Sequence, residues 1–247
     1  MGGSSAPFVA EYVRRSDEAR RELGDRVQSL AGGSLLVEAH RGAPLLVFVH
    51  GGYWQALSAA ASLYLAPGAL AQGWSYAAID YTIAPEGTLP RMVGEVSAGL
   101  AAVADAAGDC SMVVAGHSAG AHLVAMTTLA AHAPAPVVRS VLVSGVFDLR
   151  PIVHTTVNDP LGLDLPHAVQ SSPMLLPVVG APDVVVTWGD NETDAFKAQS
   201  ITYAAVLRSA GRSVAMFERA DRHHFDIVDD LVDPTTELGA RALGGLS

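Results

Sequence analysis

The chain has 247 residues, of which 50% are hydrophobic and 16% are charged, and its 25 Asp and Glu outnumber its 15 Lys and Arg for a formal net charge of −10. This composition excludes intrinsic disorder, and an acidic chain without a basic stripe is not expected to bind nucleic acid. The single cysteine, Cys110, allows no internal disulfide.

No apolar run approaches the roughly eighteen residues of a membrane span, and the first residues lack the pattern of a signal peptide. We therefore expect a cytoplasmic protein with no membrane partner.

Short apolar segments alternate with longer amphipathic ones along the chain. Residues 9–23 carry mixed charge at helical spacing and predict a solvated helix. Strands are expected at 34–40, 44–50, 75–81, 111–116, 139–145, 183–189 and 213–219, and the main helices at 57–71, 91–107, 119–132 and 194–210. Continuous runs of Val, Ile and Leu separated by helices are typical of an α/β fold, in which a mostly parallel sheet is covered by helices on both faces.

Residues 150–177 interrupt this alternation. The segment contains five prolines, at 151, 160, 166, 173 and 177, and we expect it to form a small cap or insertion over the strand ends, with short helices. The sequence has no repeats or low-complexity tracts. We therefore expect one α/β domain over residues 1–247.

The motif Gly116-His117-Ser118-Ala119-Gly120 has the pattern G-x-S-x-G. It follows an expected strand and opens an expected helix, which is the setting of a nucleophile elbow. The glycines allow a tight turn, and the helix N-terminus favours a developing negative charge near Ser118. The alternative is that Ser118 only caps an ordinary helix.

A second motif, His50-Gly51-Gly52-Tyr53-Trp54, directly follows another expected strand. Such a glycine pair can form an oxyanion hole together with the amide after the nucleophile, so we expect the donors to be the N–H groups of Gly51, Gly52 and Ala119. The alternative is a glycine turn with two core aromatic residues. Tyr53 and Trp54 are the predicted substrate-binding residues, and Tyr81 and Trp188 are further candidates for the pocket wall.

In this architecture the acid and then the histidine follow the serine along the chain. His223 and His224 alone among the nine histidines lie after the last expected strand, and Phe225 favours His224 because it can anchor it. The other histidines near the motif, at 117 and 122, are expected to pack or hydrogen bond. The acid should follow the strand at 183–189, among Asp190, Glu192 and Asp194, and Asp194 is expected to be a helix N-cap.

His223 and His224 lie close to Asp221 and Asp226, but no metal-binding spacing is present. The chain also lacks phosphate-binding and dinucleotide-binding glycine motifs. We therefore expect no metal and no cofactor, and a small-molecule substrate as the partner.

Five segments together resemble the serine-hydrolase kynurenine formamidases, a family of the α/β-hydrolase superfamily near the hormone-sensitive-lipase-like esterases. The segments are HGGYW at 50–54, DYTIAPEGTL at 80–89, GHSAGAHL at 116–123, SGVFDLRPIV at 144–153 and HHFDIV at 223–228. The first and third occur in many esterases, whereas the second and fourth are more specific. The resemblance extends over residues 35–232.

The resemblance places the nucleophile at Ser118, the base at His224 and the acid at Glu192, four residues before Phe196. Many members of the family have Asp at that position, so Asp190 remains a rival acid. The implied reaction is hydrolysis of N-formyl-L-kynurenine, or a related N-formyl aryl amine, through a formyl-serine intermediate. A small-ester carboxylesterase and a catalytically inactive binding protein of the same fold are the alternatives.

Overall fold

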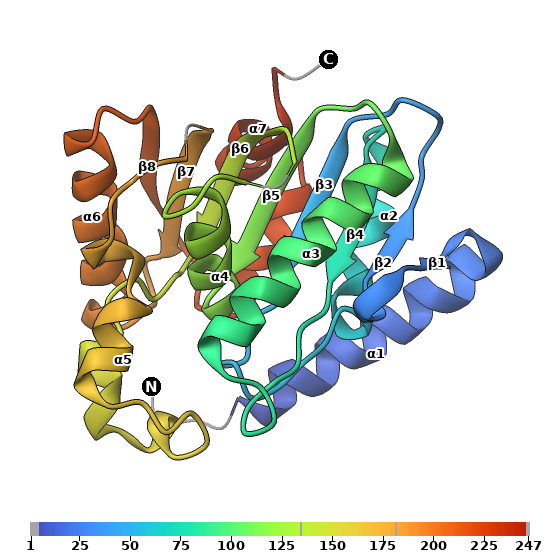
Figure 1. The fold of residues 1–247 in the computed structure, drawn as a ribbon. Helices are drawn as coiled ribbons and strands as arrows, with labels where there is room; N and C mark the ends of the chain where they lie inside the picture. The colour runs from blue at the N-terminus through green and yellow to red at the C-terminus, as the bar shows by residue number, and fades with distance from the viewer. Residues whose placement is uncertain (1–4, 134, 181, 246–247) are drawn as a thin grey trace.

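The computed structural model describes residues 5–133, 135–180 and 182–245. Its centre is an eight-stranded sheet in the order β1-β2-β4-β3-β5-β6-β7-β8 (Figure 1). The strands are β1 Gln28–Ser29, β2 Leu35–Val37, β3 Leu45–Val49, β4 Ser75–Ile79, β5 Met112–His117, β6 Val137–Val143, β7 Asp183–Gly189 and β8 Val214–Arg219. β2 pairs antiparallel with β1 and with β4, and all other pairs are parallel. The predicted mostly parallel sheet is confirmed.

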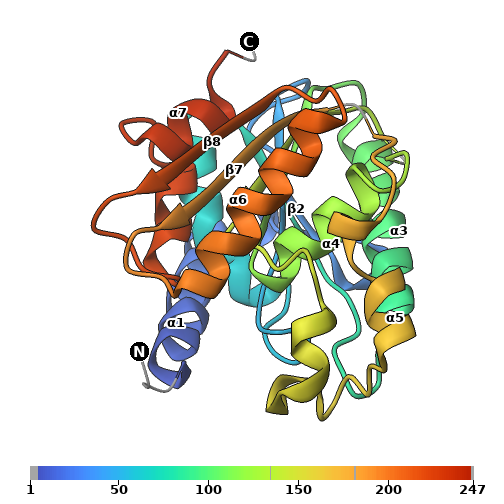
Figure 2. The same cartoon turned by 90° about the vertical axis from the view of Figure 1, so that its left-hand side faces the viewer.

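Helices cover both faces of this sheet. They are α1 Ala6–Leu23, α2 Ala66–Ala71, α3 Leu89–Ala107, α4 Ala119–Thr128, α5 Leu165–Gln170, α6 Asp194–Ser209 and α7 Glu237–Leu243. Figure 2 separates the layers, with α3, α4 and α5 on one side of the sheet and α1 and α7 on the other. Single turns of 3₁₀ helix occur at η1 Gly24–Arg26, η2 Ala31–Gly33, η5 Thr156–Asn158 and η6 Pro173–Leu175, and longer ones at η3 Ala60–Leu65, η4 Arg150–His154 and η7 Asp226–Val232.

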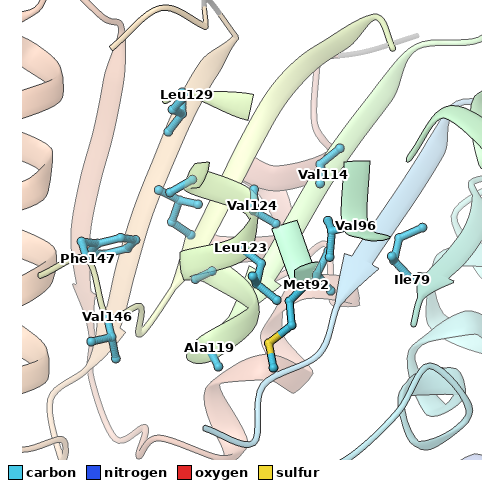
Figure 3. Packing of buried hydrophobic residues seen from close by; sticks show 14 of the residues in the cluster. Ile79, Met92, Val96, Val114, Ala119, Leu123, Val124, Leu129, Val146 and Phe147 are labelled. Atoms are coloured by element: carbon cyan, nitrogen blue, oxygen red, sulfur yellow. The ribbon is translucent and has the colours of Figure 1, made fainter. Parts of the chain in front are cut away.

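Side chains of the central strands point alternately to the two faces of the sheet, and each face has its own hydrophobic core. In β3, Leu45, Val47 and Val49 belong to the cluster under α3, α4 and α6, whereas Leu46 and Phe48 belong to the cluster under α1, α2 and α7. Successive side chains of a strand point to opposite faces, so a strand buried on both faces must be apolar throughout. Figure 3 shows part of the first cluster, in which side chains of α3 and α4 meet side chains of the sheet.

Three local predictions differ from the structure. The helix expected at 57–71 is divided into η3 and α2, because Pro67 lies in the first turn of α2 and lacks the N–H that a continuous helix needs. β1 was not expected, and β2 ends at Val37. The prediction that residues 9–23 form a solvated helix is wrong for one face of that helix, since α1 buries Tyr12 and Leu23 against the rest of the protein.

The insertion at 150–177 contains η4, η5, α5 and η6, which confirms the expected short helices. Within the described residues, no helix combines the length and the hydropathy that a membrane crossing requires. The assignment of residues 1–247 to one domain stays a prediction.

Candidate active site

Ser118 lies at a sharp bend between β5 and α4, as the motif predicts. Its backbone angles of φ 55° and ψ −117° are rare for a residue with a side chain, and they persist because the surrounding structure holds them. The Ser118 amide donates to the carbonyl of Val143 at the end of β6, at 2.9 Å. The bend therefore projects Ser118 at the carboxyl edge of the sheet and leaves it 2% exposed.

The two glycines of the motif are required by contact with main chain. A Cβ atom on Gly116 would lie 2.4 Å from the carbonyl oxygen of Gly120, and one on Gly120 would lie 2.0 Å from that of Val49. No side chain could relieve these contacts by rotating, because both neighbours are backbone. The elbow and the loop after β3 therefore pack directly against each other.

His224 lies in the loop between β8 and η7, and Glu192 lies in the loop between β7 and α6. Nδ1 of His224 is 2.8 Å from Oε2 of Glu192. The other oxygen, Oε1, accepts hydrogen bonds from the Ser144 hydroxyl and from the Gly189 amide at 2.8 Å. The structure thus pairs His224 with Glu192, the acid that the family resemblance indicated.

Burial raises the pKa of Glu192, but hydrogen bonds from His224, Gly189 and Ser144, together with the charge on His224, lower it by more. The net pKa lies below the ordinary value of a glutamate, so the carboxylate is ionised at neutral pH. An ionised carboxylate accepts the Nδ1 proton of His224 and leaves Nε2 free to accept a proton.

Asp190 and His223, the rival residues, have other partners. Oδ1 of Asp190 accepts from the amide of Arg222 at 3.2 Å. Nδ1 of His223 accepts from the amides of Phe225 and Asp226, and this turn shapes the loop that carries His224. The N-cap of α6 is Thr193, so the N-cap prediction for Asp194 is wrong.

His117 links the elbow to the histidine loop. Its Nε2 donates to the carbonyl oxygen of His224 at 2.7 Å, and the two rings are 4.6 Å apart. Burial, with repulsion from His224 second, holds the pKa of His117 well below its usual value, so its ring is neutral. Among the described residues, Ser118 Oγ makes no hydrogen bond to His224. Such contacts often form fully only when substrate is bound.

Gly51 and Gly52 lie beside the serine as expected. A Cβ atom on Gly51 would lie 3.1 Å from Cβ of Ser118, so the loop backbone approaches the nucleophile closely. Among the described residues, the amides of Gly51 and Gly52 donate to no protein acceptor. Ala119 is the first residue of α4, where the helix provides no partner for an N–H group.

Trp54 and Tyr53 differ in exposure. Tyr53 is 40% exposed, whereas Trp54 is fully buried and donates through Nε1 to Nδ1 of His122 at 3.1 Å. The prediction that Trp54 contacts substrate is therefore wrong, because its side chain fills the core under the loop. Tyr81 and Trp188 are each 5% exposed and also belong to the core. His122 packs and hydrogen bonds, as expected.

Two residues of this site had no predicted role in it, although Phe196 was used to place Glu192. Ser144, with φ 52°, follows β6 and donates to Glu192, and Phe196 places its ring 4.4 Å from that of His224. The signal for Ser144 is its position directly after a buried strand adjacent to β7. In the part of the chain that the structure describes, no group of three or more His, Cys, Asp or Glu is placed to hold a metal ion.

A sequence model of the BD-FAE family matches residues 36–146. Over 200 residues the chain is 37% identical to the kynurenine formamidase of Danio rerio, and this match covers 77% of this chain and 68% of that protein. The chain belongs to the kynurenine formamidase family. The Drosophila melanogaster kynurenine formamidase is 32% identical, with coverage of 76% and 68%.

Solved structures agree with the fold of this formamidase family member. A proposed thioesterase from Silicibacter sp. TM1040 superposes with a TM-score of 0.85 at 29% identity and covers 98% of this chain and 94% of its own. A Pyrobaculum calidifontis esterase gives 0.72 at 18% identity, with coverage of 98% and 91%. The chain is thus an α/β-hydrolase fold enzyme of hydrolytic type.

Proposed function

We propose that this protein hydrolyses N-formyl-L-kynurenine, or a related N-formyl aryl amine, to formate and the free amine, with Ser118, His224 and Glu192 as a catalytic triad. The observation that carries the proposal is the Glu192–His224 hydrogen bond, made between the loops after β7 and β8 at the same edge of the sheet as the Ser118 elbow. The kynurenine formamidase relatives supply the substrate class.

In the first step, Nε2 of His224 takes the proton of Ser118 as Oγ attacks the formyl carbon. The amides of Gly51, Gly52 and Ala119 stabilise the oxyanion of the tetrahedral intermediate. When the intermediate collapses, the carbon–nitrogen bond breaks, and His224 returns the proton to the nitrogen, because an aryl amide anion is a poor leaving group.

In the second step, water gives a proton to His224 and attacks the formyl-serine. The second intermediate releases formate, and the proton on His224 returns to Oγ of Ser118. The ionised Glu192 holds the imidazole orientation through both steps and stabilises the imidazolium that forms in each.

The crowding around Ser118 supports a small acyl group. The serine is 2% exposed and lies close to the backbone of Gly51. Formyl is the smallest acyl group, so it needs the least space beside the nucleophile. Recognition of the aromatic ring then falls to other side chains, of which the exposed Tyr53 in the same loop is one.

The testing experiment is a spectrophotometric assay of N-formyl-L-kynurenine with wild type and Ser118→Ala. We expect the variant to lose about 10⁴-fold or more in kcat, because the nucleophile is removed. Ser200→Ala is the matched control, since Ser200 is fully buried in α6 and its hydroxyl has no partner among the described residues. Equal activity of wild type and Ser118→Ala would contradict the proposal.

A carboxylesterase is the second candidate, because the chain is 29% identical to the esterase LipQ of Mycobacterium tuberculosis over 76% of this chain and 51% of that protein. Parallel assays with p-nitrophenyl acetate decide between the two. Turnover of the ester without turnover of the formamide would replace our proposal with the esterase. The hydrogen-bonded Glu192–His224 pair favours either hydrolase over an inactive binding protein.

We also propose a cytoplasmic location, which the single cysteine of the chain supports.

A further inference from the structure

The hydroxyl of Tyr81, two residues beyond β4, reaches two consecutive carbonyls of the loop after β3. It is 3.0 Å from the carbonyl oxygen of His50 and 3.3 Å from that of Gly51, so its proton is shared between them. Burial, with the charge of Asp80 second, raises the pKa of Tyr81, and the hydroxyl therefore remains a donor at every physiological pH. The phenol is 5% exposed and is not available to substrate.

These two carbonyls belong to the peptide units that carry the N–H groups of Gly51 and Gly52. A peptide unit is planar, and in the trans form its C=O and N–H point in opposite directions. Both carbonyls converge on one hydroxyl, so both N–H groups point away from it. The hydrogen bonds from Tyr81 therefore constrain the direction of both amides.

The side chain of His50 also contacts this loop. Its ring stacks on Tyr81 with centroids 4.2 Å apart and an interplanar angle of 9°. Nδ1 lies 2.9 Å from the carbonyl oxygen of Gly51, which can only accept, so Nδ1 carries the proton. The Gly51 carbonyl therefore accepts from both His50 and Tyr81.

We infer that Tyr81, assisted by His50, is a positioning residue that orients the Gly51 and Gly52 amides toward the oxyanion. This inference rests on the proposed function, which makes those amides the oxyanion donors. Glycine at 51 and 52 gives the loop its close approach but also its freedom, with φ +98° at Gly52. Tyr81 removes that freedom before substrate arrives, which is the preorganisation that such a site requires.

The test compares Tyr81→Phe with Tyr76→Phe. Tyr76, in β4, is also a buried tyrosine whose hydroxyl donates to a backbone carbonyl, but this carbonyl is that of Ser62 in η3, at 2.7 Å, whereas Tyr81 donates to His50 and Gly51. We expect kcat of Tyr81→Phe to fall about 10- to 100-fold with KM changed less than about twofold, because the oxyanion forms only after binding. Tyr76→Phe should keep the wild-type kcat.

The rate of labelling by a fluorophosphonate gives a reading independent of the natural substrate. Wild type that is not labelled would refute the proposed serine nucleophile. Wild type and Tyr81→Phe labelled at the same rate would refute the positioning role alone.

A second pair of variants does not depend on the stability of Tyr81→Phe. His50→Asn keeps a donor near the position of Nδ1, and His50→Leu removes it. We expect His50→Asn to be labelled at least about tenfold faster than His50→Leu, given the cost of misplacing an oxyanion donor. Equal rates for the two variants would overturn the part assigned to His50.

Discussion

The two carboxylate oxygens of Glu192 have different partners. Oε1 accepts from Ser144 and from the main-chain amide of Gly189, while Oε2 faces Nδ1 of His224. An amide N–H can only donate, so the atom in the Oε1 position must be an acceptor. In a Glu192→Gln variant the carbonyl oxygen would therefore occupy this position, and the NH₂ group would face His224.

We expect Glu192→Gln to lower kcat about 10³- to 10⁴-fold, because the NH₂ group forces the proton of His224 onto Nε2, which then cannot accept the proton of Ser118. Asp190→Asn is the control and should change kcat less than about threefold, since Asp190 contacts the amide of Arg222 and not His224. Steady-state assays of both variants decide the matter. A larger loss in Asp190→Asn would identify Asp190 as the acid.

At this scale the sequence predicts residue types well and contacts poorly. The serine and its glycines follow from a local turn, so the pattern suffices. The choice between His223 and His224 does not follow from a local pattern, because it depends on which ring contacts Glu192, 32 residues away. Trp54 presents the same difficulty, since its buried ring contacts His122 on α4, 68 residues away in the chain.

At the scale of elements, helix α1 is attached to the loop that carries His224. The ring of Phe8 stacks on that of Phe225 at 4.4 Å, the hydroxyl of Tyr12 donates to the carbonyl of Phe225, and Nη1 of Arg15 is 2.9 Å from Oδ1 of Asp229. Phe225 in turn packs edge-on against His224. The first helix of the chain therefore supports the catalytic loop.

We expect Phe8→Ala to lower kcat about two- to tenfold, because an aromatic pair contributes roughly 0.5–1.5 kcal/mol that here holds the loop. Val13→Ala provides the comparison, since Val13 is an apolar residue of α1 with a similar exposed fraction, 42% against 38% for Phe8, whereas the ring of Phe8 is the one that stacks on Phe225. Kinetics and thermal unfolding are measured on both variants. If both lose the same small amount of activity, α1 has no part in holding the loop.

Strands were easier to predict than the helices between them. β7 has the predicted bounds. Six of its seven residues are buried, and it pairs with β6 on one side and with β8 on the other. The apolar spacing that predicts one helix at 57–71 does not reveal that the chain turns between η3 and α2. Helix boundaries depend on where the backbone hydrogen bonds are lost, and apolar spacing does not report this.

Across the whole molecule, two buried neutral histidines make stability depend on pH. Burial lowers the pKa of His122 to about 4 and holds that of His117 well below its usual value. As the pH falls below about 6.5, the unfolded chain binds protons at these positions and the folded chain does not, so folding loses stability. The loss continues until the pH reaches the folded pKa.

We expect each of these histidines to lower the free energy of unfolding by about 1.4 kcal/mol per pH unit below about 6.5. Urea titrations at pH 7, 6 and 5 measure this slope, and His122→Gln should reduce it. His132→Gln, at an exposed histidine, should leave it unchanged. A slope that is identical in wild type and His122→Gln would show that His122 binds its proton over the same pH range in the folded and the unfolded chain, which would contradict this prediction.

The sheet and its two helical layers could be predicted because buried parallel strands have a distinctive composition. The path of residues 150–177 could not be predicted, because it depends on isolated contacts. One example is the hydrogen bond from Nε2 of Gln55 to the carbonyl oxygen of Val157, at 2.6 Å. Such contacts join segments about a hundred residues apart and leave no periodic pattern.

Ser118, Ser144 and Glu192 each follow one of three strands that lie side by side, β5, β6 and β7. The ladder that aligns these strands consists of main-chain bonds, which nearly any amino acid can make. Substitutions at helix positions that do not contact the catalytic loops can therefore accumulate without displacing Ser118, Ser144 or Glu192. We expect new substrate specificities to arise by substitution in the segments that connect the strands, while the hydrogen-bonded strands keep the reacting residues in place.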